Sequence, residues 1–590
     1  MRRRLKRGPL PAATWPPTAP AGLRGFGFGF GFAIAALLLV SFGLRIWGYR
    51  NGLPYAYNAD ENAHFVPRAI GLFGHGWDPH YHVNPPAYTY LLHIVFAVWF
   101  GGREGVSHAF ATDPGSVFAV ARVVSALLGT AAVGLLYLAG ARLFDRRVAF
   151  LAAALLGVGF LPVFYSHLAL NDAPALAPVA LALWAAAGVL RFGRRRDYAI
   201  AGLGIGLAVA TKYTAGIVAL PLLAAIVAQY AAPRGRNAAV RGALIAGIIA
   251  VAAFVIADPY AVLNVSAFHD GLAHQTTAAG DELGKLGLTQ SNGLVYYLWT
   301  FGWGMGWVAL IAAAVGALLL LRDEPRLSLV LAPAPILFIL YMGSQERFFG
   351  RWLLPVFPLV SLLAAYGALE LARMATARLP ALRPLAIGVA VAALCGQGIY
   401  YAVHSDRVLA RDDTRALTRA WMVDHIPVGA RIVAEPVSPD GWAQDVGSPS
   451  DTDNGNRWNK FPTSSARNLI ARSVVGGSQR TLNPEDYERT LVPELIPEYE
   501  RQGYCWVVVG STQRGRAEAE PGKVPEAIAY YRLLERRSRV VFHASPYDPG
   551  AGPVAFNFDW SFDYYPRAYH RPGPEMTVYR LRGGKCAVVS

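Results

Sequence analysis

The sequence predicts a helical membrane protein that carries a soluble α/β domain in its last third. Two observations predict this class. Of the 590 residues, 54% are hydrophobic and only 16% are charged, whereas about 25% of residues are charged in an average soluble domain. The hydrophobic residues gather in long runs up to about residue 403, and the chain from 404 to 590 is more polar.

About eleven of these runs are long enough for membrane spans, since about 20 apolar residues cross the hydrocarbon core. The first run lacks the small-residue cleavage site that follows a signal peptide, so we interpret it as a retained span. The predicted spans are 27–47, 116–140, 148–164, 174–190, 198–211, 213–231, 240–258, 294–321, 327–342, 352–372 and 382–403.

Loop charges predict the orientation. The run 86–101 is apolar but short and follows Pro85, so it is either a span or a helix in the interface. If it does not cross, every Arg-rich loop lies on the side of the basic segment 1–26, as the positive-inside rule requires. If it crosses, the loop RFGRRRD (191–197) lies outside. We therefore predict a multi-pass protein of the plasma or inner membrane in which 1–26 is cytoplasmic.

This orientation divides the chain into three parts. The cytoplasmic N-terminus 1–26 precedes a transmembrane domain, 27–403, whose first external loop, 48–115, carries interfacial helices. Residues 404–590 form a soluble extracytoplasmic domain. Its α/β character is predicted by a helical pattern and four short apolar runs, at 412–426, 430–435, 505–510, 539–544 and 576–581. Cys505 and Cys586 share this domain and could pair.

Other function classes lack support. No CxxC, HExxH or GxxxxGK[ST] motif occurs, so nothing indicates a zinc protease or an ATP-driven pump. The net charge of +15 could suggest nucleic acid, but much of the Lys and Arg lies in short loops between apolar runs. Orientation and contact with anionic membrane lipids explain that placement, so we expect no nucleic-acid partner.

Several segments carry a family resemblance when they are taken in order. They are ADE (59–61), NPPAYTYLLHIVFAVWFG (84–101), SHLALNDAPALAPVALALW (166–184), GLGIGLAVATKYTAGIVALPLL (202–223) and RWLLPVFPLV (351–360). Over roughly 25–405 the chain resembles glycosyltransferase family 39, which comprises protein O-mannosyltransferases and lipid A aminoarabinose transferases with the GT-C fold. The resemblance implies transfer of a sugar from a polyprenyl-phosphate donor to an acceptor outside the cytoplasm. In that family the acid of the first external loop is the catalytic base, and it matches Asp60.

The chemistry of such a transfer is consistent with a single carboxylate. A lipid phosphate needs little protonation to leave, so an inverting transfer requires mainly a base for the acceptor hydroxyl. A glycosidase, with its poor leaving group, needs a paired acid and base instead. Asp60 has a structural alternative, because Asp often caps a helix. Its neighbour Glu61 is expected to be structural or to support the site without acting as a second base.

The remaining candidate residues fall into two groups. Asp172 could orient the acceptor or join a metal, or cap a helix; His64 follows Asp60 by one helical turn. The developing phosphate charge requires cations, and Lys212, Arg347 and Arg351 stand at span ends, although Lys212 could also be an interfacial anchor. Relatives commonly carry a basic residue or His before the Pro-Pro pair, as a phosphate or metal contact. At that position this chain has Asn84, which could donate a hydrogen bond to the donor phosphate but brings no charge.

Two further functions stay open. A transporter or flippase would place ionisable residues near the middle of its spans, but here they cluster at one face. The sequence does not distinguish a single-sugar transferase from a ligase that moves a whole oligosaccharide.

The sequence also does not specify the sugar, the carrier length or the acceptor, which could be protein, lipid or cell-wall glycan. No cofactor is certain, and a divalent metal stays possible although NADE lacks the DxD spacing. The polar loop 448–465 and the aromatic segment 556–570 either contact carbohydrate or the acceptor, or belong to a covering domain in which the aromatic residues form the core.

Overall fold

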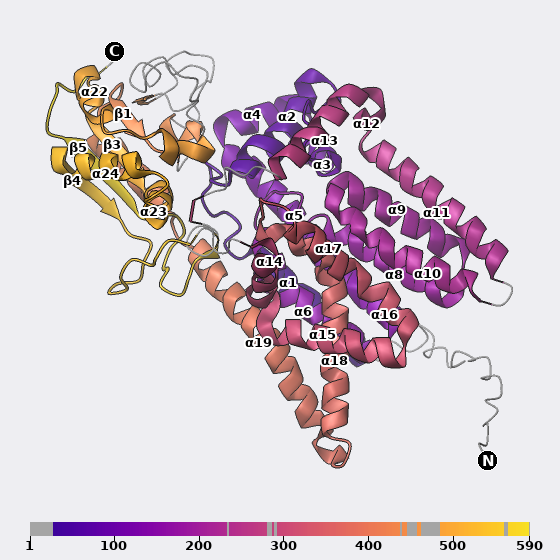
Figure 1. The fold of residues 1–590 in the computed structure, drawn as a ribbon. Coiled ribbons are helices and arrows are strands. Elements are labelled where there is room, and N and C mark those ends of the chain that lie inside the picture. The colour runs from indigo at the N-terminus through magenta and orange to yellow at the C-terminus, as the bar shows by residue number, and fades with distance from the viewer. Residues whose placement is uncertain are drawn as a thin grey trace, which may run out of the picture.

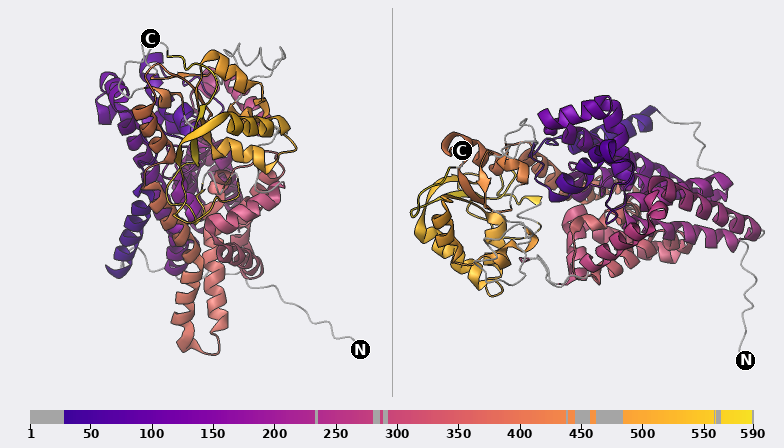
Figure 2. Two further views of the ribbon diagram at one scale, coloured as in Figure 1. Left: turned by 90° about the vertical axis from the view of Figure 1, so that its left-hand side faces the viewer. Right: turned by 90° about the horizontal axis from the view of Figure 1, so that it is seen from above.

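The computed structural model describes most of the chain. The described residues are 28–232, 235–279, 286–287, 292–436, 439–444, 457–461, 484–557, 559 and 564–588. The predicted N-terminal segment 1–26 and most of the polar loop 448–465 lie outside them. Figures 1 and 2 show a long helical part and a smaller α/β domain that lies beside its upper half.

Each predicted span lies in one to three helical elements of the structure. Seven helical stretches of the described residues are long and apolar enough to cross a membrane, and the other predicted spans lie in shorter helices. The helices concerned are α1 (Phe28–Ile46), α5 (Pro114–Leu143), α6 (Arg146–Val158), α7 (Phe160–Tyr165), α8 (Leu176–Phe192), α9 (Arg195–Thr211), η2 (Tyr213–Val218), α10 (Ala219–Tyr230), α11 (Arg236–Ala257), α14 (Gly293–Phe301), η3 (Gly302–Gly306), α15 (Trp307–Asp323), α16 (Pro325–Leu331), α17 (Pro333–Gly343), η4 (Gly350–Val356), α18 (Phe357–Ala375), η5 (Pro380–Leu382) and α19 (Arg383–Leu409).

The predicted span 148–164 is interrupted. α6 ends at Val158, and Gly159 takes the non-helical angles φ −58° and ψ 134° before α7 begins. Pro162 lies four residues after Val158, where its ring and missing N–H disfavour a continuous helix. α7 is therefore a separate short helix. It ends at Tyr165, directly before the segment 166–175, which carries Asp172.

Short helices gather at the upper end of the helical part, on the same side as the α/β domain (Figure 1). They are η1 (Glu61–Phe65), α2 (Val66–His75), α3 (Ala87–Phe100), α4 (Arg103–Thr112), α12 (Tyr260–Leu263) and α13 (Val265–Ala279). α3, with 14 residues, is about 21 Å long, whereas the hydrocarbon core is about 30 Å thick. Its length favours the interfacial position predicted for 86–101, which stays a prediction.

Glycines allow α15 and α18 to pack closely. A Cβ on Gly316 would lie 2.1 Å from the carbonyl oxygen of Leu363, and one on Gly367 would lie 2.1 Å from that of Ala312. Only residues without a Cβ permit this approach, which is common between membrane helices. The contact fixes α18, and α18 continues directly from η4, which carries Arg351.

The C-terminal domain has the predicted α/β character. Its five-stranded sheet has the order β2-β1-β3-β5-β4, in which β1 runs parallel to β2 and β3 and the pairs with β5 are antiparallel. The elements are α20 (Thr414–His425), β1 (Arg431–Ala434), η6 (Asp440–Ala443), β2 (Asn459–Lys460), η7 (Pro484–Thr490), α22 (Leu495–Gln502), β3 (Trp506–Gly510), α23 (Ser511–Ala519), α24 (Pro525–Arg537), β4 (Ser538–Ala544) and β5 (Met576–Leu581).

Sequence expectations in this domain are confirmed at the level of its elements. The helical pattern 412–426 is α20, whose start is capped by Asp413, and the four apolar runs are β1, β3, β4 and β5. Cys505 and Cys586 form a disulfide. In the aromatic segment 556–570 the described tyrosines Tyr564, Tyr565 and Tyr569 are buried in the same core as the membrane helices, which favours the covering role over carbohydrate contact.

Candidate active site

The segment between α1 and α5 places Asp60 and Glu61 at the start of a wide helical turn, η1. The side-chain oxygen of Asn58 accepts hydrogen bonds from the backbone N–H groups of Asp60 and Glu61, at 3.1 and 3.2 Å. Asp60 itself makes no capping hydrogen bond. Asn58, and not Asp60, therefore caps this helical turn, so the capping role considered for Asp60 belongs to Asn58.

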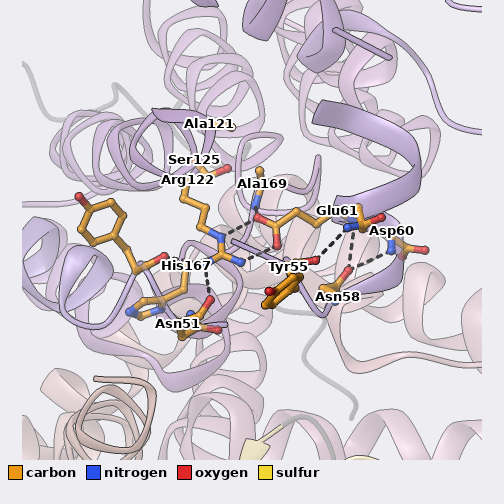
Figure 3. Close-up of polar contacts among 12 residues, drawn as sticks. Asn51, Tyr55, Asn58, Asp60, Glu61, Ala121, Arg122, Ser125, His167 and Ala169 are labelled. Carbon is orange, nitrogen blue, oxygen red and sulfur yellow. Dashed lines mark hydrogen bonds and ion pairs between the residues drawn. The ribbon is translucent and has the colours of Figure 1, made fainter. Parts of the chain in front are cut away.

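The Glu61 side chain points toward Arg122 in the protein interior (Figure 3), whereas the Asp60 side chain is 38% exposed. Both carboxylate oxygens of Glu61 accept from Arg122 of α5, each at 2.7 Å, and the Ala169 N–H donates to the same carboxylate at 2.9 Å. Glu61 and Arg122 are fully buried. Arg122 also donates to the carbonyl oxygens of Tyr49 and Asn51. The Glu61–Arg122 pair thus connects three parts of the protein, which are the segment that follows α1, helix α5 and the segment 166–175.

Four of the predicted residues form one continuous chain of ion pairs. Arg351 Nη2 donates to Asp60 Oδ2 at 2.7 Å, and its Nε lies 3.7 Å from Asp172 Oδ2. Lys212 Nζ donates to Asp172 Oδ1. Residues from three distant parts of the sequence therefore meet in the order Asp60, Arg351, Asp172, Lys212.

The two carboxylates of this chain differ in exposure. The side chain of Asp60 is 38% exposed, whereas that of Asp172 is 3% exposed. A molecule arriving from solvent can therefore reach Asp60 but not Asp172. Arg351 contacts both carboxylates through different nitrogens, which a planar guanidinium with five N–H donors can do and an ammonium group cannot match.

Local structure holds the inner half of the chain. α9 ends at Thr211, and Lys212 has an extended backbone before η2 begins. Asn171 donates its side-chain N–H to the carbonyl oxygen of Thr211 at 2.8 Å. This bond ties the residue before Asp172 to the residue before Lys212, so the two charged side chains meet.

An aromatic and basic group lies beside Asp60. His64 stacks on Tyr81 with ring centroids 4.6 Å apart, and its Nε2 is 3.9 Å from Asp60 Oδ1. The guanidinium of Arg68 lies over the same Tyr81 ring at 4.3 Å. Burial lowers the pKa of His64 against the opposing effect of Asp60. Burial also raises the pKa of Tyr81 to about 12, so its hydroxyl stays protonated at neutral pH.

The other predicted donor contacts are placed differently. Asn84 donates to the hydroxyl of Tyr81 at 2.9 Å, and Arg347 lies over the ring of Phe349 at 5.3 Å. Asn84 thus belongs to the aromatic group beside Asp60, whereas Arg347 contacts the ring of Phe349. No group of three or more His, Cys, Asp or Glu side chains among the described residues could hold a metal ion.

Sequence reasoning missed Arg122, Asn58 and Tyr81. Arg122 had a detectable signal, because a charge inside an apolar run marks a buried partner or a functional site. Asn58 stands two residues before Asp60, where an Asn is a common helix cap. Tyr81 had no such signal, since its role depends on His64 and Arg68 folding against it.

Comparison with known proteins agrees with this architecture. No curated protein matches the sequence. The family model described as dolichyl-phosphate-mannose-protein mannosyltransferase matches residues 84–257, a stretch that contains α3 to α11 together with Asp172 and Lys212. The matched stretch does not include Asp60 or Arg351.

Solved structures of membrane enzymes are similar to the chain over most of its length. The oligosaccharyltransferase of Archaeoglobus fulgidus, in a complex with zinc and sulfate, is 12% identical over 93% of this chain and 88% of its own, with a TM-score of 0.50. ArnT from Cupriavidus metallidurans bound to undecaprenyl phosphate is 12% identical over 94% and 98%, with a TM-score of 0.48. The mycobacterial arabinofuranosyltransferase AftD is 17% identical over 95% and 40%, with a TM-score of 0.43.

The chain has the GT-C fold, and the matched segment supports a membrane glycosyltransferase. The predicted helical GT-C fold and the resemblance to GT-C glycosyltransferases are thereby confirmed, whereas the number of spans and the side of the membrane stay predictions. These comparisons do not identify the donor, the acceptor or the roles of individual residues.

Proposed function

We propose that this chain transfers a sugar from a polyprenyl-phosphate donor to a hydroxyl acceptor at the extracytoplasmic membrane surface, with Asp60 as general base. The observation that carries the proposal is the ion-pair chain of Asp60, Arg351, Asp172 and Lys212. It combines one accessible carboxylate with two cations, the groups that this reaction requires. A family model whose description includes dolichyl-phosphate-mannose supports a lipid-phosphate donor.

The reaction needs one proton acceptor and one stabilised leaving group. The acceptor oxygen forms a bond to the anomeric carbon of the sugar while the bond from that carbon to the phosphate oxygen breaks. The acceptor's proton passes to the Asp60 carboxylate, and the electron pair of the broken bond leaves with the polyprenyl phosphate. Because that phosphate gains negative charge, cations next to it stabilise the transition state.

Lys212 and Arg351 are the cations proposed for this role. Their two positive charges balance the two carboxylates of the ion-pair chain, so a donor phosphate must compete with Asp60 and Asp172 for them. Arg351 contacts Asp60 directly, so donor binding and activation of the base are expected to be linked through this residue. Buried Asp172 is proposed to hold the two cations together, and His64 and Asn84 to shape the acceptor side.

The side of the membrane is part of the proposal. The short helices and the C-terminal domain lie toward one end of the helical part (Figure 1), and loop charges predict that this end is extracytoplasmic. An alkaline phosphatase fused after residue 405 should be active. An inactive phosphatase together with an active cytoplasmic reporter at the same position would contradict the orientation.

The direct test uses purified protein in liposomes. A labelled polyprenyl-phosphate sugar is supplied with a cell-envelope extract as acceptor, and the product is separated by thin-layer chromatography. We expect the label to leave the lipid and to appear on an acceptor as a single sugar. Transfer of a whole oligosaccharide only, from a matching lipid-linked donor, would identify a ligase, and label that changes leaflet without leaving its lipid would identify a flippase.

A further inference from the structure

Two residues of the C-terminal domain are buried inside the helical part. Asp559 is 1% exposed and Tyr564 is 3% exposed. The hydroxyl of Tyr296 in α14 donates to Asp559 Oδ1 at 2.8 Å, and the carbonyl oxygen of Asp559 accepts from the N–H of Tyr564 at 3.1 Å. The domain therefore reaches among the membrane helices at a point that hydrogen bonds fix.

Tyr564 contacts two segments, the one that leads to Asp172 and the one that carries Arg351. Its hydroxyl forms a hydrogen bond with the hydroxyl of Tyr165 at 2.9 Å, and Tyr165 ends α7 directly before the segment with Asp172. A Cβ on Gly350 would lie 2.8 Å from the Tyr564 hydroxyl oxygen. Gly350 precedes Arg351, so one hydroxyl group lies against the two segments whose charged side chains must meet.

The ring of Tyr564 has little room to move. Its centroid is 4.4 Å from that of Trp303 in η3, 5.2 Å from that of Phe164 and 5.6 Å from that of Phe160. Interiors are packed as densely as organic crystals, so a ring enclosed on these sides keeps its hydroxyl in place.

We propose that Tyr564 is a positioning residue that holds Arg351 and Asp172 in the arrangement needed at Asp60, so that the C-terminal domain completes the active site. The inference rests on the proposed function for its consequence in catalysis. The charged and titratable groups that face Asp60 are Arg351, His64, Tyr81 and Lys212, and Arg351 is the one whose position Tyr564 would hold.

The first experiment compares two conservative variants of the full chain. Tyr564→Phe removes the hydroxyl group and keeps the ring. Tyr569→Phe is the matched control, because Tyr569 is a buried tyrosine of the same segment whose ring packs edge-to-face against Tyr547 of the C-terminal domain. Two readouts do not depend on turnover: hydrogen exchange of the backbone at 348–356, and binding of undecaprenyl phosphate without a sugar.

We expect Tyr564→Phe to raise amide exchange at 348–356 and to weaken undecaprenyl phosphate binding by roughly two- to tenfold, the range that loss of one hydrogen bond gives. The pH profile of transfer should also change, because Arg351 would hold Asp60 less well. Tyr569→Phe should change neither readout. Equal effects of the two variants, or no effect of Tyr564→Phe, would overturn the inference.

A double variant tests the contact itself. Gly350→Ala places a methyl group against the Tyr564 hydroxyl and should lower phosphate binding. Adding Tyr564→Phe removes the obstructing oxygen, so the double variant should bind better than Gly350→Ala alone. Strictly additive losses would contradict a direct contact. If wild-type protein binds the phosphate but transfers no sugar, the proposed function fails while the exchange and binding results still decide the inference.

Discussion

Arg351 of η4 donates to the carboxylate of Asp60 at 2.7 Å, although the two residues are 291 positions apart in the sequence. The same guanidinium lies 3.7 Å from Asp172. Arg351 is thus the residue through which the accessible carboxylate is connected to the buried ion pair, and the first prediction concerns it.

Replacing Arg351 by Lys should retain the fold but lose most of the transfer activity. An ammonium group can approach one of the two carboxylates but cannot reproduce the two directed contacts of the guanidinium. A carboxylate beside a cation ionises at lower pH, so Arg351→Gln should also move the acid limb of kcat/KM to higher pH. Steady-state rates between pH 4 and 9 check both points, and an unshifted acid limb would speak against contact with the base.

Replacing Lys212 by Ala should weaken use of the lipid donor. Loss of a charge-assisted hydrogen bond to phosphate costs about 1–3 kcal/mol. The structure adds a second effect, because buried Asp172 loses its closest cation. Lys212→Arg should restore part of the activity. Donor KM and turnover are measured beside protein yield; a lower yield with unchanged kinetics would make Lys212 an interfacial anchor only.

Replacing Glu61 by Gln should act on stability. Arg122 would keep its buried charge without a carboxylate to balance it, and breaking a buried ion pair costs about 3–5 kcal/mol. Transfer per folded molecule should persist, because Glu61 faces away from Asp60. Thermal unfolding in detergent tests the change, and Glu61→Gln combined with Arg122→Met should recover stability. An unchanged midpoint in the single variant would show that the pair is not structural.

Buried Glu435 predicts how the stability of the C-terminal domain varies with pH. It accepts from Tyr531 Oη at 2.7 Å and from the Gly510 N–H at 2.9 Å, and burial raises its pKa to about 8. A carboxyl group whose folded pKa is raised stabilises the fold fully below its unfolded pKa, and this contribution is lost as pH rises through the folded value. The wild-type protein should therefore lose part of its stability between pH 5 and 9.

Glu435→Gln provides the comparison for that prediction. The amide resembles the protonated acid, since its oxygen can accept from Gly510 and its NH₂ group can donate to the Tyr531 hydroxyl. The difference between the two unfolding curves over pH 5 to 9 isolates this group from the others that titrate. The same slope in both proteins would contradict the raised pKa.

Much of the fold could be predicted because its signals are local. Long apolar runs predicted the membrane helices, and short apolar runs predicted β1, β3, β4 and β5. The break at Gly159 was missed, because the apolar run continues across it and hydropathy does not register backbone angles.

The candidate site could be predicted only as a set of residues. Family resemblance and span ends pointed to Asp60, Asp172, Lys212 and Arg351, but their pairing depends on tertiary structure. The partner of Glu61 was hidden for the same reason, as Arg122 lies 61 residues further along the chain. An aromatic segment has the same composition whether it binds sugar or fills a core, so the burial of Tyr564 required the structure.

The central claim is that Asp60 accepts the proton of the acceptor hydroxyl. Asp60→Asn keeps an oxygen that can accept from Arg351 but cannot take up a proton. The matched control is Asp113→Asn, in the same external segment, because Asp113 caps α5 and Asn caps a helix equally well.

The most direct measurement is the single-turnover rate of sugar transfer from a labelled polyprenyl-phosphate donor, beside donor binding by the same protein. The account predicts that Asp60→Asn binds the donor but transfers about 10²–10⁴ times more slowly, while Asp113→Asn transfers at the wild-type rate. A folded Asp60→Asn protein that transfers at a near-normal rate would contradict the account and direct attention to Asp172.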